Sequence, residues 1–391
     1  MASLGAIALW FVLRVPTPPR PYLPFPPGKQ CVLSITDDTD YFQFATTKPV
    51  YDLLNRFGAR VTKTVWVFDD PKSTPEKEGL SLTNRTYKDW VLEQKRYGHE
   101  ITLHSAASGD DPRDRTLAAY DSLEAMLGEL PRLEIFHKAN KEAFYWGAER
   151  LPSGVLRRLY EARMSGRFEG NKPESEYYWV DRARSLIRYV RTYTFNDMDT
   201  WAVNPSMPYE DPSTPEAPLW FASSNGRWGQ DFVRLATPAN LDRLKEAHGV
   251  SIIYVHLATG FDTPEAMSAM ARCAGDADVE FVPAGELLDR LRLIQRVRTQ
   301  LDQGADRIRV PVALRSEFAL VSVQPQELGT VRGVDGKTLP SRLSLQDWLE
   351  RVDVEVEWTN DSIFAEPEVI SRWEKWRLVA KWLWTQVATP T

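Results

Sequence analysis

Between residue 31 and about residue 299, short apolar segments alternate with segments whose apolar residues recur at helical spacing. The apolar segments indicate buried strands, and the first helical segment is stopped by Gly58. Strands that alternate with helices predict parallel β/α units, and therefore a barrel or a doubly wound sheet. The strand-like segments are 31–35, 65–68, 100–104, 132–137, 219–224, 250–257 and 279–282.

Two later regions depart from this alternation. Residues 165–217 are rich in proline, glycine and tyrosine, which predicts long loops of the kind that form binding walls. Residues 302–391 contain three segments with period-two alternation, which predicts a small antiparallel β module. This module ends in an amphipathic helix that carries Trp373, Trp376, Trp382 and Trp384. Either packing on the module or a place at a membrane interface would suit that helix.

Residues 1–29 are unlike the rest of the chain. Leu4 to Leu13 is an apolar run that is too short for a full membrane span, and no basic leader or Ala-x-Ala cleavage site flanks it. The following stretch, Pro16 to Pro27, is rich in proline and predicts a stiff, extended linker. A clipped signal-anchor has this pattern, so we expect a protein that is exported or anchored in the membrane at the cell envelope.

Charge and cysteine content exclude several classes of protein. The net charge of the 391 residues is -6 with no basic block, which argues against a nucleic acid partner. The two cysteines, Cys31 and Cys273, exclude a disulfide framework and a zinc–thiolate site. A single Cys31–Cys273 bridge stays open.

Chemistry-bearing residues gather where the predicted strands end. The first strand runs into three carboxylates, Asp37, Asp38 and Asp40, and three later strands end in His104, His137 and His256. In parallel β/α folds these strand ends share one edge, where ligands bind. A carboxylate with two imidazoles suits a divalent transition metal, which would also relieve the repulsion between adjacent aspartates.

The segments SITDDTD, GHEITLHS and IIYVHL, in this order and spacing, resemble the motifs of the polysaccharide deacetylases with a NodB-like domain. The resemblance covers roughly residues 30–295. It implies an α/β fold, namely a deformed (β/α) barrel over residues 30–299, followed by the β module at 302–391. It also implies a divalent metal cofactor, with zinc expected.

The resemblance assigns roles to individual residues. The first aspartate of the family's pair is the general base and the second binds the metal, which corresponds to Asp37 and Asp38. His104 matches a metal-binding histidine and His256 the late histidine motif, whereas the family's second metal histidine is replaced by Ser108. The family's strand-borne Arg-x-Pro motif is absent.

A third metal ligand must then come from elsewhere in the chain. His137 follows the next predicted strand and is the expected ligand, with Asp110 or Asp111 as alternatives. Expected contacts to the sugar are made by Lys138, Asn140, Trp179 and Trp220.

These assignments predict metal-assisted hydrolysis of an N- or O-acetyl group on a cell-surface or exported polysaccharide. Asp37 would be the base and His256 the acid. A catalytically inactive glycan-binding protein on the same scaffold is the alternative. A glycosidase that uses carboxylates such as Asp37 and Glu169 ranks last, because it would need no histidines at the strand ends.

Overall fold

The computed structural model describes residues 19–72, 79–137, 140–144, 148–164 and 168–388. Neither Lys138 nor the apolar run Leu4 to Leu13 lies within these residues. Both cysteines are free and buried. Among the described helices, none has the length and apolar character needed to cross a membrane.

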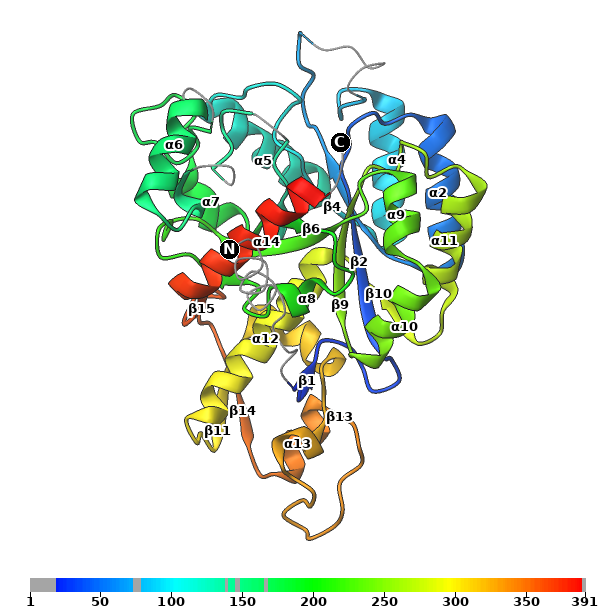
Figure 1. Ribbon diagram of the computed structural model, residues 1–391, viewed down its shortest axis with the longest axis vertical. Coiled ribbons are helices and arrows are strands. Elements are labelled where there is room, and N and C mark those ends of the chain that lie inside the picture. Colours follow the sequence, from blue (N-terminus) through cyan, green and yellow to red (C-terminus); the bar gives the residue numbers. More distant parts are fainter. Residues whose placement is uncertain (1–18, 73–78, 138–139, 145–147, 165–167, 389–391) are drawn as a thin grey trace, which may run out of the picture.

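The predicted barrel is confirmed. In the described part of the chain, seven parallel strands pair in a closed ring, in which each pairs with the next and the last pairs back with the first (Figure 1). In ring order they are β2 (Cys31–Asp37), β3 (Thr62–Val65), β4 (Glu100–Leu103), β5 (Leu133–Glu134), β6 (Tyr189–Phe195), β8 (Leu219–Asn225) and β9 (Val250–Val255).

The ring is deformed beside β2, whose seven residues are all buried. β3 pairs only with the end of β2, at Thr36 and Asp37. The beginning of β2 pairs instead with β10 (Val279–Phe281). β2 therefore has neighbours along its whole length, and its carboxyl end points its polar residues at the mouth of the barrel.

Helices surround the barrel, and their limits follow the sequence closely. Gly58 adopts a left-handed conformation (φ 66°) and ends the first helix, as predicted. The Asn84 side chain accepts a hydrogen bond from the Tyr87 amide and caps the next helix. The surrounding helices are α2 (Phe44–Phe57), α4 (Arg85–Arg96), α5 (Arg113–Leu127), α6 (Gly154–Met164), α9 (Gly229–Leu235), α10 (Pro238–Glu246), α11 (Pro264–Gly275) and the largely buried α12 (Ala284–Asp302).

The prediction of long loops for residues 165–217 was wrong, because one strand of the barrel lies in this region. This region contains the barrel strand β6, together with α7 (Val180–Leu186), α8 (Thr200–Val203) and β7 (Tyr209–Glu210). β6 has the sequence YVRTYTF, so Arg191, Thr192 and Thr194 interrupt any apolar run. Arg191 and Thr192 are buried although they are polar. Because of these polar residues, β6 lacks the uninterrupted apolar pattern that predicted the other strands.

The region after residue 302 is less β-rich than predicted. β11 (Arg307–Pro311) and β14 (Glu355–Thr359) pair in parallel rather than antiparallel. Helical turns lie between them, at η2 (Val312–Leu320), η3 (Pro325–Leu328) and α13 (Leu345–Arg351). The other elements here are β12 (Ser322–Val323), β13 (Leu343–Ser344), β15 (Glu368–Val369) and α14 (Arg372–Ala388), and η1 (Ala148–Arg150) precedes α6.

Several contacts join this region to the rest of the protein. β12 pairs with β1 (Tyr22–Leu23), and β15 pairs with β7 of the main sheet. α14 packs on β6. The domain boundary at residue 302 stays a prediction, and these contacts favour an extension that packs on the barrel over a loosely tethered module.

Candidate metal centre

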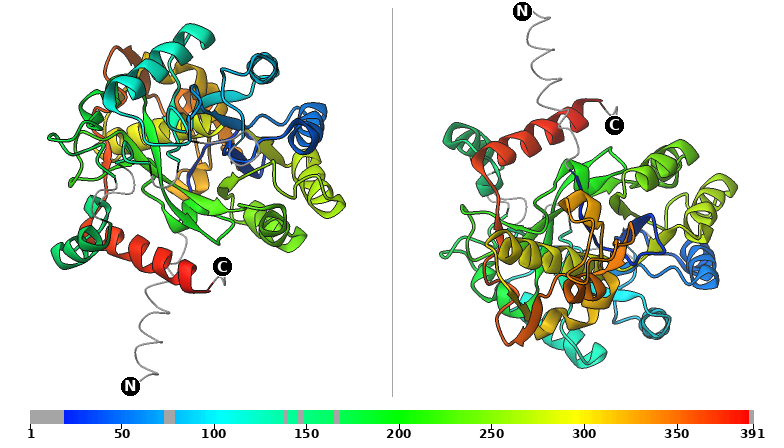
Figure 2. Two further views of the ribbon diagram at one scale, coloured as in Figure 1. Left: turned by 90° about the horizontal axis from the view of Figure 1, so that it is seen from above. Right: turned by 90° about the horizontal axis from the view of Figure 1, so that it is seen from below.

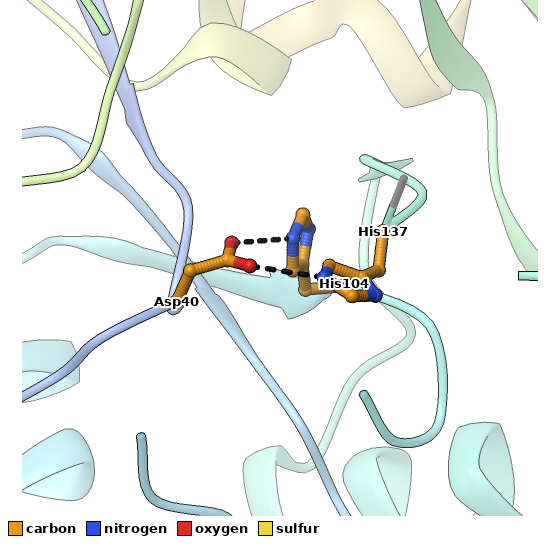
Figure 3. Close-up of side chains that lie close together, drawn as sticks. All are labelled: Asp40, His104 and His137. Atoms are coloured by element: carbon orange, nitrogen blue, oxygen red, sulfur yellow. Dashed lines mark hydrogen bonds and ion pairs between the residues drawn. The ribbon is translucent and has the colours of Figure 1, made fainter. Parts of the chain in front are cut away.

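Three histidines surround one carboxylate at the mouth of the barrel, and the carboxylate is that of Asp40. His104 Nε2 lies 2.9 Å from Asp40 Oδ2, and His137 Nε2 lies 3.0 Å from Oδ1 (Figure 3). His256 Nε2 lies 3.3 Å from Oδ2. Burial raises the pKa of Asp40, but when the imidazoles carry their protons the charge of His104 and hydrogen bonds from all three rings outweigh it and hold the pKa well below its usual value.

A buried turn directs Asp40 toward the histidines. The amide of Thr39, just before it, donates a hydrogen bond to the Thr64 hydroxyl, and the Thr39 hydroxyl shares another with the Tyr87 hydroxyl, so the chain is anchored as it leaves β2. Gly79 packs against this turn. A Cβ atom at Gly79 would lie 2.9 Å from the Phe42 nitrogen and 3.0 Å from the Thr39 oxygen, so only glycine leaves the turn undisturbed.

His104 and His137 each use Nδ1 for a hydrogen bond, which leaves Nε2 to face Asp40. His104 Nδ1 donates to the Ile135 carbonyl oxygen at 2.6 Å. His137 Nδ1 lies 3.0 Å from Asn140 Oδ1. A histidine whose Nδ1 carries the proton presents a lone pair on Nε2, which is the form that binds metals.

The orientation of the Asn140 amide is fixed by its other contacts. Its nitrogen donates to the Ala107 and Gly109 carbonyl oxygens, at 3.2 and 2.6 Å, and to Glu142 Oε1 at 2.8 Å. Three acceptors around one amide group identify it as the NH2 end, so Oδ1 must accept from His137. Asn140 therefore sets the tautomer of His137.

These tautomers make the cluster suitable for a cation. Two Nε2 lone pairs face the Asp40 oxygens, an arrangement that either bound protons or one metal ion can stabilise. Ligand atoms of a tetrahedral zinc ion lie roughly 3.3 Å apart, because each bond is about 2.0–2.1 Å long. Asp40, His104 and His137 match this spacing and form one of two groups of described residues that could hold a metal.

The second group shares Asp40 and adds Asp38 and His256. His256 is the least constrained of the three imidazoles, since its Nδ1 atom is buried without a hydrogen-bond partner. Its ring stacks on Trp228, with ring centres 4.8 Å apart, and lies 5.9 Å from Tyr41. Tyr41 is 41% exposed, so His256 lies beside the open side of the site.

Asp38 is held by an arginine rather than by a histidine. Arg191 on β6 approaches both Asp38 oxygens, at 2.8 and 3.3 Å, and its guanidinium stacks over the Tyr254 ring at 4.3 Å. A bidentate pair of this kind fixes the plane of the carboxylate. The pair is buried next to the Asp40 cluster.

Asp37, the predicted base, has all of its acceptor positions directed into the protein. Its Oδ2 atom accepts from the Tyr51 hydroxyl and pairs with Lys63 Nζ, both at 2.9 Å, and Oδ1 accepts from the Leu257 amide at 2.8 Å. Asp37 and Lys63 are each 1% exposed. These contacts favour a structural role for Asp37.

The alternative ligands Asp110 and Asp111 lie apart from the cluster and have other partners. Asp111 accepts from the Ala107 amide and pairs with Arg115, and Asp110 accepts from the Lys141 amide. Neither belongs to a group of described residues that could hold a metal.

Burial of the side chains speaks against three of the predicted sugar contacts. Trp179 is fully buried, and its indole donates to the Glu142 carbonyl oxygen. Trp220 is 3% exposed within β8, and Asn140 is 3% exposed behind His137. The fourth, Lys138, lies outside the described residues.

A group of buried carboxyls lies behind Asn140. Burial raises the pKa of Glu142 to about 7, and it raises the pKa of Asp111 to about 6. Glu134, on β5, accepts from the Tyr120 hydroxyl at 2.6 Å, and burial raises its pKa to about 8. Burial therefore shifts each carboxyl group in the support behind His137 toward its neutral form.

Sequence reasoning missed Asp40 as the central carboxylate and Arg191 as a site residue. Asp40 was one of the three carboxylates after the first strand, but the adjacent pair drew attention away from it. Arg191 lies in a strand that was taken for a loop. A charged residue flanked by alternating tyrosines in YVRTYTF is the pattern by which it could have been found.

No protein-family model and no curated protein matches this chain. Among solved structures, it is similar to Puue allantoinase, with 13% identity over 70% of this chain and 93% of that one, and a TM-score of 0.40. It is also similar to a probable polysaccharide deacetylase from Pseudomonas aeruginosa PAO1 (14% identity, 67% and 91% of the two chains, TM-score 0.37). A family 4 acetyl xylan esterase from Clostridium thermocellum, in complex with a cobalt ion, is a third such structure (15% identity, 66% and 89%, TM-score 0.34).

Proposed function

We propose that the protein removes an acetyl group from a saccharide by hydrolysis, with Asp40, His104 and His137 holding a divalent metal ion, for which zinc is our choice. The observation that carries this proposal is the pair of Nε2 atoms that face one buried carboxylate, each with its Nδ1 proton committed elsewhere. Compared with the motif-based expectation, Asp40 takes the ligand role of Asp38. His104 and His137 keep the ligand roles expected from the sequence.

A bound metal ion would polarise the acetyl carbonyl and lower the pKa of a water molecule. Asp38 would accept a proton from the attacking water as general base. Its place beside the Asp40 cluster and its fixed orientation against Arg191 support this role. Asp37 has the base role by motif, but its contacts with Lys63, Tyr51 and the Leu257 amide speak against it.

His256 would protonate the departing nitrogen or oxygen when the bond to the acetyl carbon breaks, which releases acetate. Its place beside the exposed Tyr41, on the open side of the site, supports the acid role, as does its longer distance of 3.3 Å from Asp40 Oδ2. The stacked Trp228 ring limits rotation of the imidazole.

Tyr41 and Trp228 are our candidates for the sugar contacts, in place of Trp179 and Trp220. Both rings lie beside His256 and neither is buried, so they could stack on a sugar ring at the site mouth. The guanidinium of Arg227 lies over Trp228 at 4.3 Å and holds the indole in place.

Acetate release from a panel of acetylated oligosaccharides tests the proposal. We expect Asp38→Asn to lower turnover by roughly 10²–10⁴-fold while metal stays bound, because the change keeps the shape but removes the base. Asp37→Asn is the matched control, with the same chemical change one residue away. It should keep most of the turnover once the folded fraction is accounted for.

Equal turnover in wild type and Asp38→Asn would contradict the base assignment. If the metal-loaded wild type releases no acetate from any member of the panel, the proposed deacetylase activity itself is contradicted. Binding of the same oligosaccharides without turnover would then support a catalytically inactive glycan-binding protein, which the replacement of the family's second metal histidine by Ser108 already suggests as the rival.

A further inference from the structure

The last helix, α14, buries Lys375 and Arg377 against the protein and exposes three of its four tryptophans. Trp373 is 64% exposed and Trp384 52%, whereas Lys375 and Arg377 are 6% and 7% exposed. Trp376 and Leu383 are also exposed and, by helical spacing, lie on the same side as the other two. A surface helix normally has the opposite polarity.

Ion pairs fix this orientation of the helix. Lys375 Nζ lies 2.5 Å from Asp211 Oδ2, and Lys381 Nζ lies 3.0 Å from Asp197 Oδ1. Arg377 donates to the Val203 carbonyl oxygen at 2.7 Å. Rotating the helix to bury the tryptophans would leave buried acidic partners such as Asp211 without a cation, which is strongly unfavourable.

A second helix extends the apolar surface. Arg150, in η1, lies over the ring of Tyr160 on α6 at 5.7 Å, and seen from above and below α6 and α14 lie at the same edge of the molecule (Figure 2). Arg150, just before α6, stacks over Trp382 of α14 at 4.7 Å. Val155 and Leu159 of α6 are 68% and 64% exposed. We call these residues together the tryptophan face: Trp373, Trp376, Leu383 and Trp384 of α14, with Val155 and Leu159 of α6.

The N-terminal segment meets the rest of the protein beside α8, which contacts α14. Arg20 pairs with Asp199 at 2.9 Å and stacks over Trp201 of α8 at 4.8 Å. α8 in turn contacts α14, because Val203 is the acceptor for Arg377. The apolar run Leu4 to Leu13 therefore lies only a few residues before the point where the chain enters the structure beside α14.

We propose that the tryptophan face binds the surface of a lipid bilayer, with its indole rings at the level of the headgroups. Tryptophan is enriched at that level, because its ring is apolar and its N–H can still donate a hydrogen bond. Stable membrane attachment takes two signals, and the sequence offers a second one in the short apolar run that precedes Arg20. A contiguous apolar surface of this kind otherwise marks a protein interface.

Flotation of the full-length protein with vesicles tests this, using phosphatidylcholine alone and with phosphatidylglycerol. The test variant is Trp373→Ser/Trp376→Ser/Trp384→Ser. The control is Val331→Ser/Val334→Ser, which removes two exposed apolar residues from a loop in another part of the chain. Partial burial of three large side chains is worth several kcal/mol, so we expect the triple variant to bind roughly 10²-fold more weakly. The control should bind like wild type.

A second measurement does not depend on the folding of the triple variant. Lipids brominated near the headgroup should quench tryptophan fluorescence of the Trp10→Phe protein, which removes the one tryptophan of the apolar run. Failure of the wild type to float, equal flotation of wild type and triple variant, or no quenching would each overturn the proposal. So would a wild-type dimer that does not float and that the triple substitution converts to a monomer, since the face would then bind a second copy.

Discussion

Asp37 and Asp40 are three residues apart, and both are buried, but the barrel treats them in opposite ways. Asp37 meets a lysine, a hydroxyl and an amide, so every partner brings its own proton. Asp40 meets imidazole nitrogens, two of which belong to rings whose Nδ1 protons are already donated elsewhere. The first carboxylate is satisfied by the protein alone, whereas the second is satisfied only when protons or a cation are added. Under the proposed function, this difference separates a structural carboxylate from one that would bind a metal.

Removing the cation that pairs with Asp37 should have the largest effect on stability. Lys63→Met leaves Asp37 charged, buried and without its cation, so we expect the free energy of unfolding to fall by about 3–5 kcal/mol. Denaturant titration followed by circular dichroism measures it. The double variant Lys63→Met/Asp37→Asn should recover much of the loss, because the buried charge is gone. A loss of less than about 1 kcal/mol in the single variant would mean that Asp37 does not need its partner.

The hydrogen bond between Asn140 and His137 offers a test of the Asp40 cluster. Asn140→Ala removes the acceptor for His137 Nδ1 and frees the ring to adopt the other tautomer, so metal affinity should fall about 10–100-fold. Competition with a chromophoric chelator measures this affinity. Ser122→Ala, on the exposed side of α5, is a control that should change nothing. Unchanged affinity in Asn140→Ala would show that its hydrogen bond does not hold the tautomer.

Glu134 offers a third kind of buried carboxyl, one with a hydroxyl donor and no cation. Because its pKa is raised to about 8 in the folded protein, the neutral form is preferred, and this group's contribution to stability declines as pH rises from about 4.5 toward 8. Glu134→Gln should remove a slope of about 1.4 kcal/mol per pH unit from the stability profile. Unfolding measured between pH 5 and 8 in both proteins gives the difference. Parallel profiles would contradict a neutral Glu134.

The sequence predicted the barrel and most of its site, and its errors have physical reasons. Strands with continuous apolar runs, such as β2 and β9, were recognisable, and so were the histidines that follow the strands. β6 was missed because it lacks an apolar run. Its Arg191 is polar but buried, where it forms an ion pair with Asp38.

The choice among the three aspartates depended on details that no pattern contains. Asp40 reaches the histidines only because the turn after β2 is held by Thr64 and Tyr87, both distant in sequence. The sequence also could not show that Trp179 and Trp220 are buried, which argues against their contact with a sugar. Aromatic residues in an exposed loop and in a barrel wall look alike in sequence.

The most direct test of the contrast between the two carboxylates is the metal content of four proteins after dialysis against zinc and then against buffer. Elemental analysis should find about one equivalent in wild type and in Asp37→Asn, and little in Asp40→Asn and His104→Ala. Circular dichroism would verify that each variant is folded. A full equivalent of metal in Asp40→Asn, or none in wild type, would contradict the account.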